Sequence, residues 1–283
     1  DALRICREVV SHLNWSKKGN KPSVKSVEPI YEQDELLGIL SEDLKSAVDI
    51  KEIIARFTDG SRFEEFKPLY GSSLVCGWAS VHGYQIGIIG NNGPIYPESA
   101  EKGASFIQLC NKRDIPLIFL HNVTGFLVGK DFERQGIIKK GSQLINAVSN
   151  STVPHITFIV GASYGAGTYA MSGQAFNNRF TFLWPTAKIA VMGPEQMAGV
   201  MSIVRKAKAK RDGKKFDEKA DKQLREMVVD FLEKLSHGLV ASSMLTDDGI
   251  IDPRDTRDVI GFCLSIVSNN VIKGAKEYGV FRL

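Results

Sequence analysis

The residues best suited to chemistry form a turn of small side chains at positions 161–167, which read Gly-Ala-Ser-Tyr-Gly-Ala-Gly. An apolar strand pattern that begins at His155 runs into this turn, and a helix pattern follows it. The first N–H groups of a helix have no acceptor within the helix, and the helix dipole favours negative charge at that end. Small residues let a ligand approach such groups closely. The turn therefore predicts a site for an anion, or for negative charge that develops during a reaction.

A serine hydrolase is the first interpretation of this turn. Positions 161–165 match the pattern G-x-S-x-G, with Ser163 as the nucleophile between a strand and a helix. Such enzymes need an acid and then a histidine downstream, and His237 is the sole histidine there. The aspartates before it are Asp212, Asp217, Asp221 and Asp230. With one downstream histidine there are few candidates for a catalytic triad, and the five-residue pattern is common by chance. Both points disfavour a hydrolase.

Two further interpretations of the turn need no nucleophile. Positions 165–170 fit the dinucleotide pattern G-x-G-x-x-A, but no acid occurs from position 174 to position 194 to hold a ribose. Alternatively, the backbone N–H groups of Ala166 and Gly167 stabilise an enolate-like oxygen. The glycines are also compatible with a structural role in tight strand–helix packing. The turn alone leaves these alternatives open.

The composition is ordinary for a globular protein. Of the 283 residues, 43% are hydrophobic and 24% are charged. The 36 basic residues exceed the 32 acidic ones by only four, so we expect no nucleic-acid partner. No apolar run approaches the roughly 18 residues that span a bilayer, so we expect no membrane association.

The cysteines and histidines show no pattern that would bind a metal. The four cysteines form no CxxC pair, and the five histidines lack metal-ligand spacing. We therefore expect no metal site and a reducing compartment without disulfides. The residues concerned are Cys6, Cys76, Cys110, Cys263, His12, His82, His121, His155 and His237.

Strand and helix patterns alternate along most of the chain, which predicts the α/β class. Asp49 is expected to cap a short helix. A helix at 97–113 carries small residues on one face, which predicts close packing. The segment 195–245 is mostly helical and partly basic, and we expect a solvated arm or a helical hairpin. The predicted strands are 74–81 and 84–90, which form a hairpin, then 116–123, the run from His155, 180–184 and 188–192, with a further helix near 137–148.

Six segments together resemble the carboxyltransferase β subunits of biotin-dependent acyl-CoA carboxylases. They are spread in the same order over nearly the whole chain, at positions 83–93, 98–103, 122–129, 184–193, 247–257 and 278–283. Within this family, Thr124 and the ending Phe281-Arg282-Leu283 resemble the 3-methylcrotonyl-CoA carboxylase branch, as does the glycine turn.

The resemblance implies a crotonase-like fold, which is a spiral of ββα units in the α/β class. It assigns residues 49–283 to the CoA carboxyltransferase C-terminal domain. Residues 1–48 would be a linker helix and connector from a missing N-terminal domain. In this family the C-terminal half holds the biotin side of the active site, while acyl-CoA is bound mainly by the N-terminal half of a partner subunit.

The resemblance also assigns roles to residues. Ala166 and Gly167 would form a backbone oxyanion hole for the ureido oxygen of biotin, and we expect a larger side chain at Gly167 to obstruct biotin more than folding. The other expected residues of the biotin pocket are Gly125, Phe126, Leu127, Tyr164 and Gly165. Those expected near acyl-CoA are Gly90, Asn91, Asn92 and Gly93.

The implied reaction moves a carboxyl group from carboxybiotin to 3-methylcrotonyl-CoA, a step of leucine degradation. Biotin would be attached to a partner α subunit, whose biotin carboxylase alone uses ATP, and the β subunits would form a homo-oligomer. The compartment would be the mitochondrial matrix in a eukaryote and the cytoplasm otherwise. The alternatives are another acyl-CoA such as propionyl- or geranyl-CoA, a decarboxylase subunit of the glutaconyl-CoA type, and a non-catalytic scaffold that docks the biotin carrier.

Overall fold

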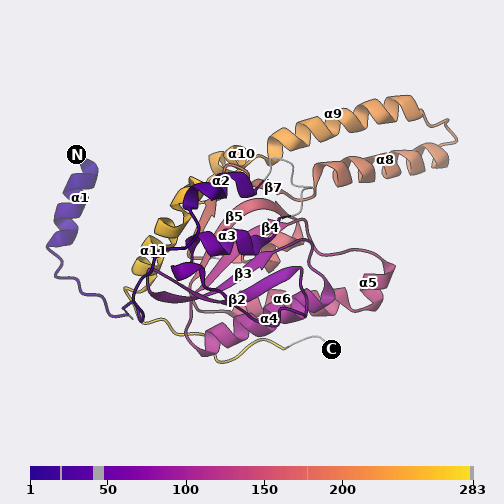
Figure 1. Cartoon of the computed structure of the whole chain (residues 1–283). Helices are drawn as coiled ribbons and strands as arrows, with labels where there is room; N and C mark the ends of the chain where they lie inside the picture. Colours follow the sequence, from indigo (N-terminus) through magenta and orange to yellow (C-terminus); the bar gives the residue numbers. More distant parts are fainter. Residues whose placement is uncertain (20, 41–47, 177, 281–283) are drawn as a thin grey trace.

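An eight-stranded sheet runs through the centre of the described part of the chain (Figure 1). The structure, a computed structural model, describes residues 1–19, 21–40, 48–176 and 178–280. The strand order is β1-β2-β3-β4-β5-β6-β8, and β7 pairs with β5. The strands are Glu64–Glu65 (β1), Leu74–Val81 (β2), Tyr84–Asn91 (β3), Leu117–Val123 (β4), His155–Tyr164 (β5), Phe180–Leu183 (β6), Lys188–Ala190 (β7) and Gly249–Ile250 (β8).

Helices connect these strands and cover both faces of the sheet. The helices predicted at 97–113 and near 137–148 lie within two residues of α4 and α6, and Asp49 caps α3 by accepting a hydrogen bond from the Lys51 N–H, as expected. The helices are Ala2–Ser11 (α1), Leu36–Ile39 (α2), Ile50–Phe57 (α3), Pro97–Lys112 (α4), Lys130–Arg134 (α5), Ile137–Asn150 (α6), Ala166–Ala170 (α7), Pro194–Arg211 (α8), Glu218–Ser236 (α9), Gly238–Ser243 (α10) and Thr256–Val267 (α11).

The sheet is antiparallel at one edge and parallel elsewhere. β2 and β3 form the predicted hairpin, and its two turn residues, His82 and Gly83, have φ values of 48° and 78°. Two consecutive positive φ values suit the right-handed twist of the flanking strands. From β3 onward, β4, β5, β6 and β8 pair in parallel. All ten residues of β5 are buried, because helices cover a parallel sheet on both faces.

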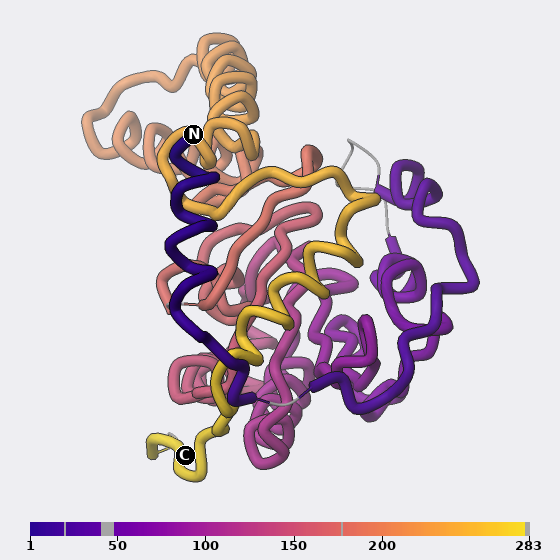
Figure 2. Tube along the Cα trace, turned by 90° about the vertical axis from the view of Figure 1, so that its left-hand side faces the viewer, coloured from indigo at the N-terminus to yellow at the C-terminus, as the bar shows by residue number. Residues whose placement is uncertain are grey.

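Apolar side chains fill both faces of the sheet. On one face α3 and α11 contribute Ile53 and Ile260 to the core, and α11, in yellow, lies across the strands (Figure 2). On the other face α4 and α6 contribute Ile107 and Leu144. The predicted close packing of α4 is confirmed at Gly103, where a Cβ would lie 2.8 Å from Leu74 and 2.9 Å from Leu144.

The segment after β7 forms a helical hairpin of α8 and α9 that extends away from the sheet (Figure 1). Asp221 on α9 ties the two helices together, because its carboxylate accepts hydrogen bonds from Ser202 at 2.6 Å and pairs with Arg205 at 2.6 Å. The predicted helical hairpin is therefore confirmed. None of the described helices is long and apolar enough to cross a membrane.

The first residues of the chain lie outside the core. Every residue of α1 is exposed, and the chain first contacts the main body where Lys17 donates to the Ser265 carbonyl oxygen at 2.9 Å. The predicted domain boundary at residue 48 adjoins positions 41–47, which are outside the described residues. The division into 1–48 and 49–283 stays a prediction.

A buried arginine joins four parts of the chain. Arg257 on α11 is 1% exposed, and its guanidinium pairs with Asp59 at 2.9 Å and donates to the Val27 carbonyl oxygen at 3.1 Å. The Asp59 carboxylate also accepts hydrogen bonds from the backbone N–H groups of His82 and Gly83, at 3.1 and 2.8 Å. The pair therefore attaches the connector and the hairpin turn to α11.

We expect Arg257→Ala to lower the free energy of unfolding by about 3–5 kcal/mol, because it leaves the Asp59 carboxylate buried without its cation. Urea-induced unfolding measures this difference. Arg254→Ala is the control, because it removes an exposed arginine that pairs with Asp252 at 2.7 Å and should leave the unfolding midpoint unchanged. Equal midpoints for both variants would contradict the prediction.

Candidate active site

The glycine-rich turn joins β5 to α7 through a conformation that requires glycine. Gly165 has φ 56° and ψ −136°, a combination that side chains disfavour. A Cβ there would also lie 2.9 Å from the carbonyl oxygen of Val191. The Gly165 N–H donates to the Ala190 carbonyl oxygen at 3.0 Å, which attaches the turn to β7. The next residue, Ala166, begins α7.

The predicted oxyanion donors are the N–H groups of Ala166 and Gly167, the first two residues of α7. At this end of a helix the N–H groups have no intrahelical acceptor. Among the described residues, neither N–H donates to a backbone carbonyl outside the helix. Ala166 is exposed and Gly167 is buried. Neither N–H is therefore used by another backbone carbonyl, and Ala166 is the residue of the two that a ligand can reach.

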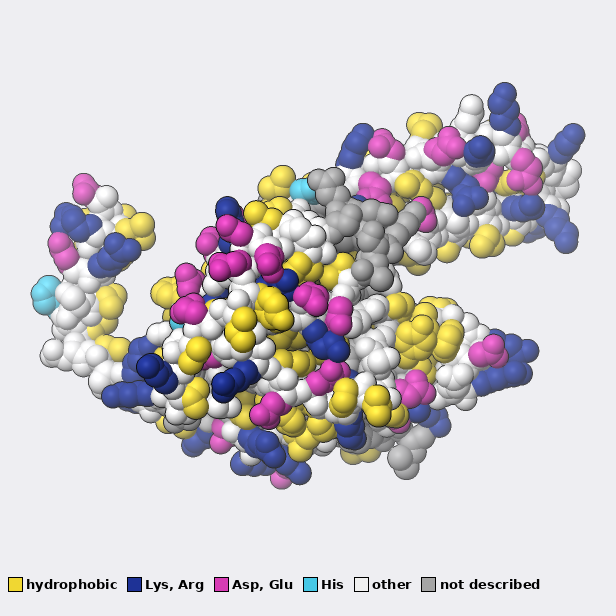
Figure 3. Space-filling model, in the orientation of Figure 1, with side chains coloured by type: hydrophobic (Ala, Val, Ile, Leu, Met, Phe, Trp, Pro, Cys, Tyr) yellow, Lys and Arg dark blue, Asp and Glu magenta, His cyan; other side chains and the backbone are white. Residues whose placement is uncertain are grey.

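A largely apolar cavity of about 390 Å³ opens beside this end of α7. It brings together Phe126, Leu127 and Ala166, which the sequence predicts to share one site. Hydrophobic side chains gather over this α5–α6 end of the molecule (Figure 3). The other lining residues are Val128, Glu133, Ile137, Ile138, Gly141, Ser142 and Ile145.

The loop after β4 is held in place by the segment that follows β3. The Ile95 N–H donates to the Gly125 carbonyl oxygen at 3.0 Å, and the Leu127 N–H donates to the Ile95 carbonyl oxygen at 3.1 Å. Gly125 has φ 128°, a value that favours glycine. Phe126 packs so closely on α6 that a Cβ at Gly141 would lie 3.0 Å from its ring. This loop forms a fixed wall of the cavity.

A side chain at Gly167 would contact the protein itself, whereas the sequence predicts that it would contact biotin. A Cβ there would lie 2.8 Å from a methyl group of Val123 and 3.2 Å from the Cα of Gly125. These atoms belong to β4 and to the loop after it, so a larger residue at Gly167 would collide with the protein itself. Such a substitution would therefore strain the fold, contrary to the expectation that it would obstruct biotin more than folding. Ala166, which is exposed and lines the cavity, is the position that tests ligand approach.

Three other predicted pocket residues, Gly125, Tyr164 and Gly165, do not line the cavity. Gly125 precedes Phe126 in the loop, and Gly165 lies within the turn. The ring of Tyr164 lies 3.6 Å from the place of a Cβ on Gly193. Burial, and then the charge of Glu233, raise the pKa of the Tyr164 phenol to about 12. Their contact with biotin stays a prediction.

The residues predicted near acyl-CoA have different surroundings. Gly90 is buried against Ile50, from which a Cβ would lie 2.8 Å away. Asn91 is 0% exposed, and its side-chain amide has no hydrogen-bond partner among the described residues. Asn92 accepts a hydrogen bond from the Ile50 N–H at 2.7 Å. Gly93, with φ 147°, has open space on its Cβ side. A role of these four residues toward acyl-CoA stays a prediction.

Ser163 has a histidine partner that the sequence did not reveal. Its Oγ lies 2.9 Å from Nδ1 of His121 on β4 and 2.9 Å from Oγ1 of Thr168 on α7. The Nε2 of His121 lies 2.7 Å from the Met171 carbonyl oxygen. Ser163 and His121 are both 0% exposed. The contact arises because β4 and β5 are parallel neighbours, so the carboxyl ends of both strands meet.

This serine–histidine pair lacks the features of a hydrolase. Burial lowers the pKa of His121 to about 4, despite the hydrogen bond to Met171, so the ring is neutral at neutral pH. A carbonyl oxygen only accepts, so Nε2 carries the proton and donates to Met171, where a catalytic triad has a carboxylate. A substrate cannot reach a serine that is 0% exposed. The pair is therefore a structural connection.

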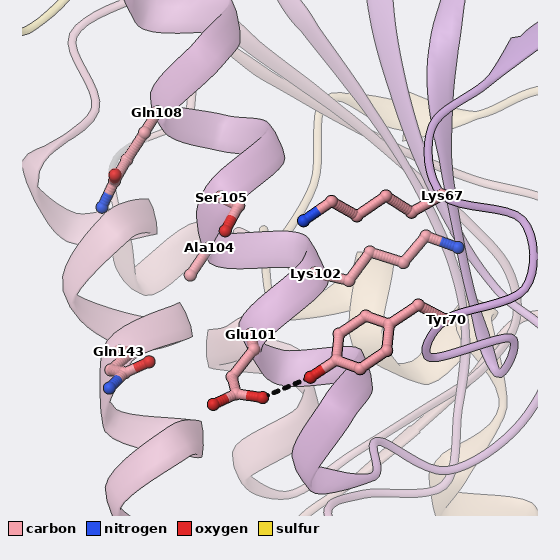
Figure 4. A pocket seen from close by; sticks show the side chains of 8 residues that line it. All are labelled: Lys67, Tyr70, Glu101, Lys102, Ala104, Ser105, Gln108 and Gln143. Carbon is pink, nitrogen blue, oxygen red and sulfur yellow. Dashed lines mark hydrogen bonds between the residues drawn. The ribbon is translucent and has the colours of Figure 1, made fainter.

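A second cavity, of about 500 Å³, lies between the loop after β1 and the helices α4 and α6 (Figure 4). Most of its lining residues carry polar groups, and Tyr70 donates a hydrogen bond to Glu101 within it. That bond raises the pKa of Tyr70 to about 12. Lys102 of α4 also lines the cavity. No residue that the sequence predicts for the active site belongs to this lining, so the cavity beside α7 is the candidate active site.

The described residues hold no group of three or more His, Cys, Asp or Glu that could bind a metal ion. The histidines His121 and His155 each bond to a serine rather than to another metal-ligating side chain. Burial raises the pKa of the Cys110 thiol to about 12, so this cysteine stays protonated.

The chain matches known proteins over its whole length. A family model described as the carboxyl transferase domain matches residues 1–281. A probable biotin-dependent acyl-coenzyme A carboxylase beta2 subunit of Mycobacterium tuberculosis is 55% identical over 100% of this chain and 54% of its own length. The mitochondrial methylcrotonoyl-CoA carboxylase beta chain of Dictyostelium discoideum is 45% identical over 100% of this chain and 48% of its own length.

The β subunit of geranyl-CoA carboxylase from P. aeruginosa has a similar structure, with a TM-score of 0.87 and 43% identity over 99% of this chain and 53% of that one. The fold is thus the crotonase-like fold of carboxyltransferase subunits, as predicted. The chain belongs to the carboxyl transferase domain family, which confirms the resemblance to β subunits of biotin-dependent acyl-CoA carboxylases. It spans about half the length of the relatives that it matches.

We expect Ser163 to resist labelling by a fluorophosphonate, because its hydroxyl is buried and hydrogen-bonded to His121 and Thr168. Intact-protein mass spectrometry after incubation with the reagent measures the labelling. Ser163→Ala serves as the control and should likewise show no added reagent mass. Stoichiometric labelling of the wild type that disappears in Ser163→Ala would restore the hydrolase interpretation.

Proposed function

We propose that the chain carries the biotin side of a carboxyltransferase active site, which moves a carboxyl group from carboxybiotin to an acyl-CoA. The observation that carries this proposal is the cavity beside α7, where two apolar residues of the loop after β4 and the donor-bearing residue Ala166 meet. Membership of the carboxyl transferase domain family supports it. Biotin, held covalently by a partner subunit, supplies the carboxyl group.

The chain's own contribution is to hold two donors where negative charge develops. The N–H groups of Ala166 and Gly167 would hold the ureido oxygen of biotin, which when bound would supply the carboxyl group, and they would stabilise negative charge on that oxygen. Preorganised donors of this kind contribute about 3–4 kcal/mol each to the transition state. They need no side-chain acid or base, which agrees with the neutral, buried His121 and with the absence of a triad in the described residues.

The cavity has the size and lining that a fused-ring, largely apolar group requires. Small-molecule sites typically enclose about 300–1,000 Å³ and combine apolar walls with a few placed polar groups. Here Phe126, Leu127 and Ile137 supply apolar walls, and the cavity encloses about 390 Å³. Apolar walls also lower the local dielectric constant around a bound ligand, which would strengthen the interaction of the donors with charge.

Binding of acyl-CoA, delivery of biotin and use of ATP require polypeptide segments outside this chain. We propose that an N-terminal domain precedes residues 1–48 in the same subunit type and binds acyl-CoA, that a biotin-carrying α subunit delivers the cofactor, and that its biotin carboxylase uses the ATP. The β subunits form a homo-oligomer. In a eukaryotic source this enzyme would work in the mitochondrial matrix, as the name of the Dictyostelium relative suggests, and otherwise in the cytoplasm.

We propose 3-methylcrotonyl-CoA as the substrate, which gives the enzyme a role in leucine degradation. The support is Thr124, an exposed residue at the entrance to the loop after β4, and the 45% identity with a methylcrotonoyl-CoA carboxylase beta chain. The ending Phe281-Arg282-Leu283 supports the same branch, although it lies outside the described residues. Geranyl-CoA is the second candidate, because the P. aeruginosa geranyl-CoA carboxylase subunit has a similar structure.

We expect Ala166→Val to lower the kcat of carboxyl transfer by about tenfold to a hundredfold, because added methyl groups displace the ligand from the donors by about 1 Å. Steady-state carboxylation by the assembled holoenzyme measures this loss, and thermal unfolding should show little change, since Ala166 is exposed.

Two further variants separate ligand approach from folding. Ala207→Val, on the exposed surface of α8, should leave both activity and melting temperature near wild type. Gly167→Val should lower the melting temperature, because its side chain collides with Val123. If Ala166→Val folds and turns over like the wild type, the assignment of Ala166 and Gly167 as donors is wrong.

We expect kcat/KM to be highest for 3-methylcrotonyl-CoA when it is compared with propionyl-, acetyl- and geranyl-CoA. Apolar contacts discriminate by only about 1–3 kcal/mol per methylene, so the preference should be about tenfold to a few hundredfold. The assembled holoenzyme is assayed with each substrate at low concentration. A clear preference for propionyl- or geranyl-CoA would overturn the substrate and leave the biotin role intact.

A further inference from the structure

A chain of three hydrogen bonds begins at Thr168 on α7 and ends at Met171, the residue that caps α7. Nε2 of His121 donates to the Met171 carbonyl oxygen, so the bare Nδ1 accepts the hydroxyl hydrogen of Ser163. With its own hydrogen used, Ser163 Oγ accepts from the hydroxyl of Thr168. The bonds therefore point in one direction, from Thr168 through Ser163 and His121 to Met171. Hydrogen bonds that follow one another in a buried chain strengthen each other.

The chain of bonds connects the two walls of the candidate active site. His121 lies on β4, four residues before Gly125, where the loop that lines the cavity begins. Thr168 lies one residue after Gly167, and Met171 caps the end of α7. The relative position of α7 and the loop after β4 thus depends on a contact between side chains of β4, β5 and α7.

The backbone hydrogen bonds around α7 are too few to fix its position alone. The ladder between β4 and β5 is irregular between His121 and Val123, and the side-chain oxygen of Asn122 accepts from the Ala162 N–H at 3.3 Å. α7 has only five residues, so its own backbone hydrogen bonds are few. A short helix beside an interrupted ladder needs other contacts to keep one position.

We propose that His121, Ser163 and Thr168 form a positioning network that holds α7 against the loop after β4, and so holds the N–H groups of Ala166 and Gly167 where charge develops in carboxyl transfer. The three residues act through α7 and touch no substrate. This inference rests on the proposed function, because it concerns the donors that the function uses. It gives a reason for a buried serine and histidine that the transfer chemistry itself leaves unused.

The test compares variants that break the network at different bonds in the assembled holoenzyme. Thr168→Val removes one hydroxyl and keeps the shape. His121→Asn keeps an acceptor near the position of Nδ1 for Ser163, whereas His121→Gln keeps a donor near the position of Nε2 for Met171. Thr256→Val is the matched control, because it removes a buried hydroxyl that bonds Pro253 and Trp184, away from α7.

We expect each network variant to lower kcat for carboxyl transfer by about tenfold to a hundredfold, as small displacements of oriented groups do. The KM for acyl-CoA should stay within about twofold, since α7 faces the biotin side. Amide hydrogen exchange of the peptide covering 164–171, measured by mass spectrometry, should be faster in Thr168→Val than in wild type. Thr256→Val should match the wild type in kcat and in the exchange of this peptide.

Different outcomes contradict the inference and the proposed function. If Thr168→Val keeps wild-type kcat and wild-type exchange, the positioning network is wrong, whatever happens to the melting temperature. If kcat is unchanged although exchange is faster, the network anchors α7 but does not serve the donors, and the inference is again wrong. A wild-type holoenzyme that carboxylates no acyl-CoA contradicts the proposed function itself, and with it the role of the network in catalysis.

Discussion

The candidate active site depends on one steric constraint, which is that no side chain fits between the start of α7 and the end of β4. At Gly167 a Cβ would lie 2.8 Å from Val123 and 3.2 Å from the Cα of Gly125. This contact lets two backbone segments approach each other directly. The apolar walls at Phe126 and Leu127 and the donor-bearing residue Ala166 share one cavity because the glycines allow that approach.

The sequence predicts those parts of the fold whose signal is local. The strand patterns of β2 to β5 and the cap at Asp49 depend on neighbouring residues, so they agree with the structure. The Gly125–Leu127 loop and the glycine turn are about 40 residues apart in the sequence, so no local pattern joins them. Only the resemblance to a family predicts that they share one site. The sequence does not predict which part of the protein a single side chain faces. Gly167 was expected to face the ligand, but a side chain there would face β4.

The partnership of Ser163 with His121 shows why a motif can mislead. The pattern G-x-S-x-G predicts a nucleophile, and the chain order of such hydrolases places its histidine downstream, where only His237 occurs. In the structure the histidine comes from upstream, because parallel strands bring their carboxyl ends together irrespective of distance in the sequence. A histidine and a serine near the carboxyl ends of two buried strands can therefore be partners, whichever of the two comes first in the chain.

Burial decides what that pair can do. A histidine whose pKa lies near 4 and whose second nitrogen donates to a backbone carbonyl cannot act as a base toward an outside substrate at neutral pH. The same burial makes each of its hydrogen bonds costly to lose, because an unpaired polar group in the core loses solvation without compensation. This buried serine–histidine pair is thus unsuited to acyl transfer but well suited to fixing a short helix. Backbone donors on that helix then need no reactive side chain, provided that their position is kept.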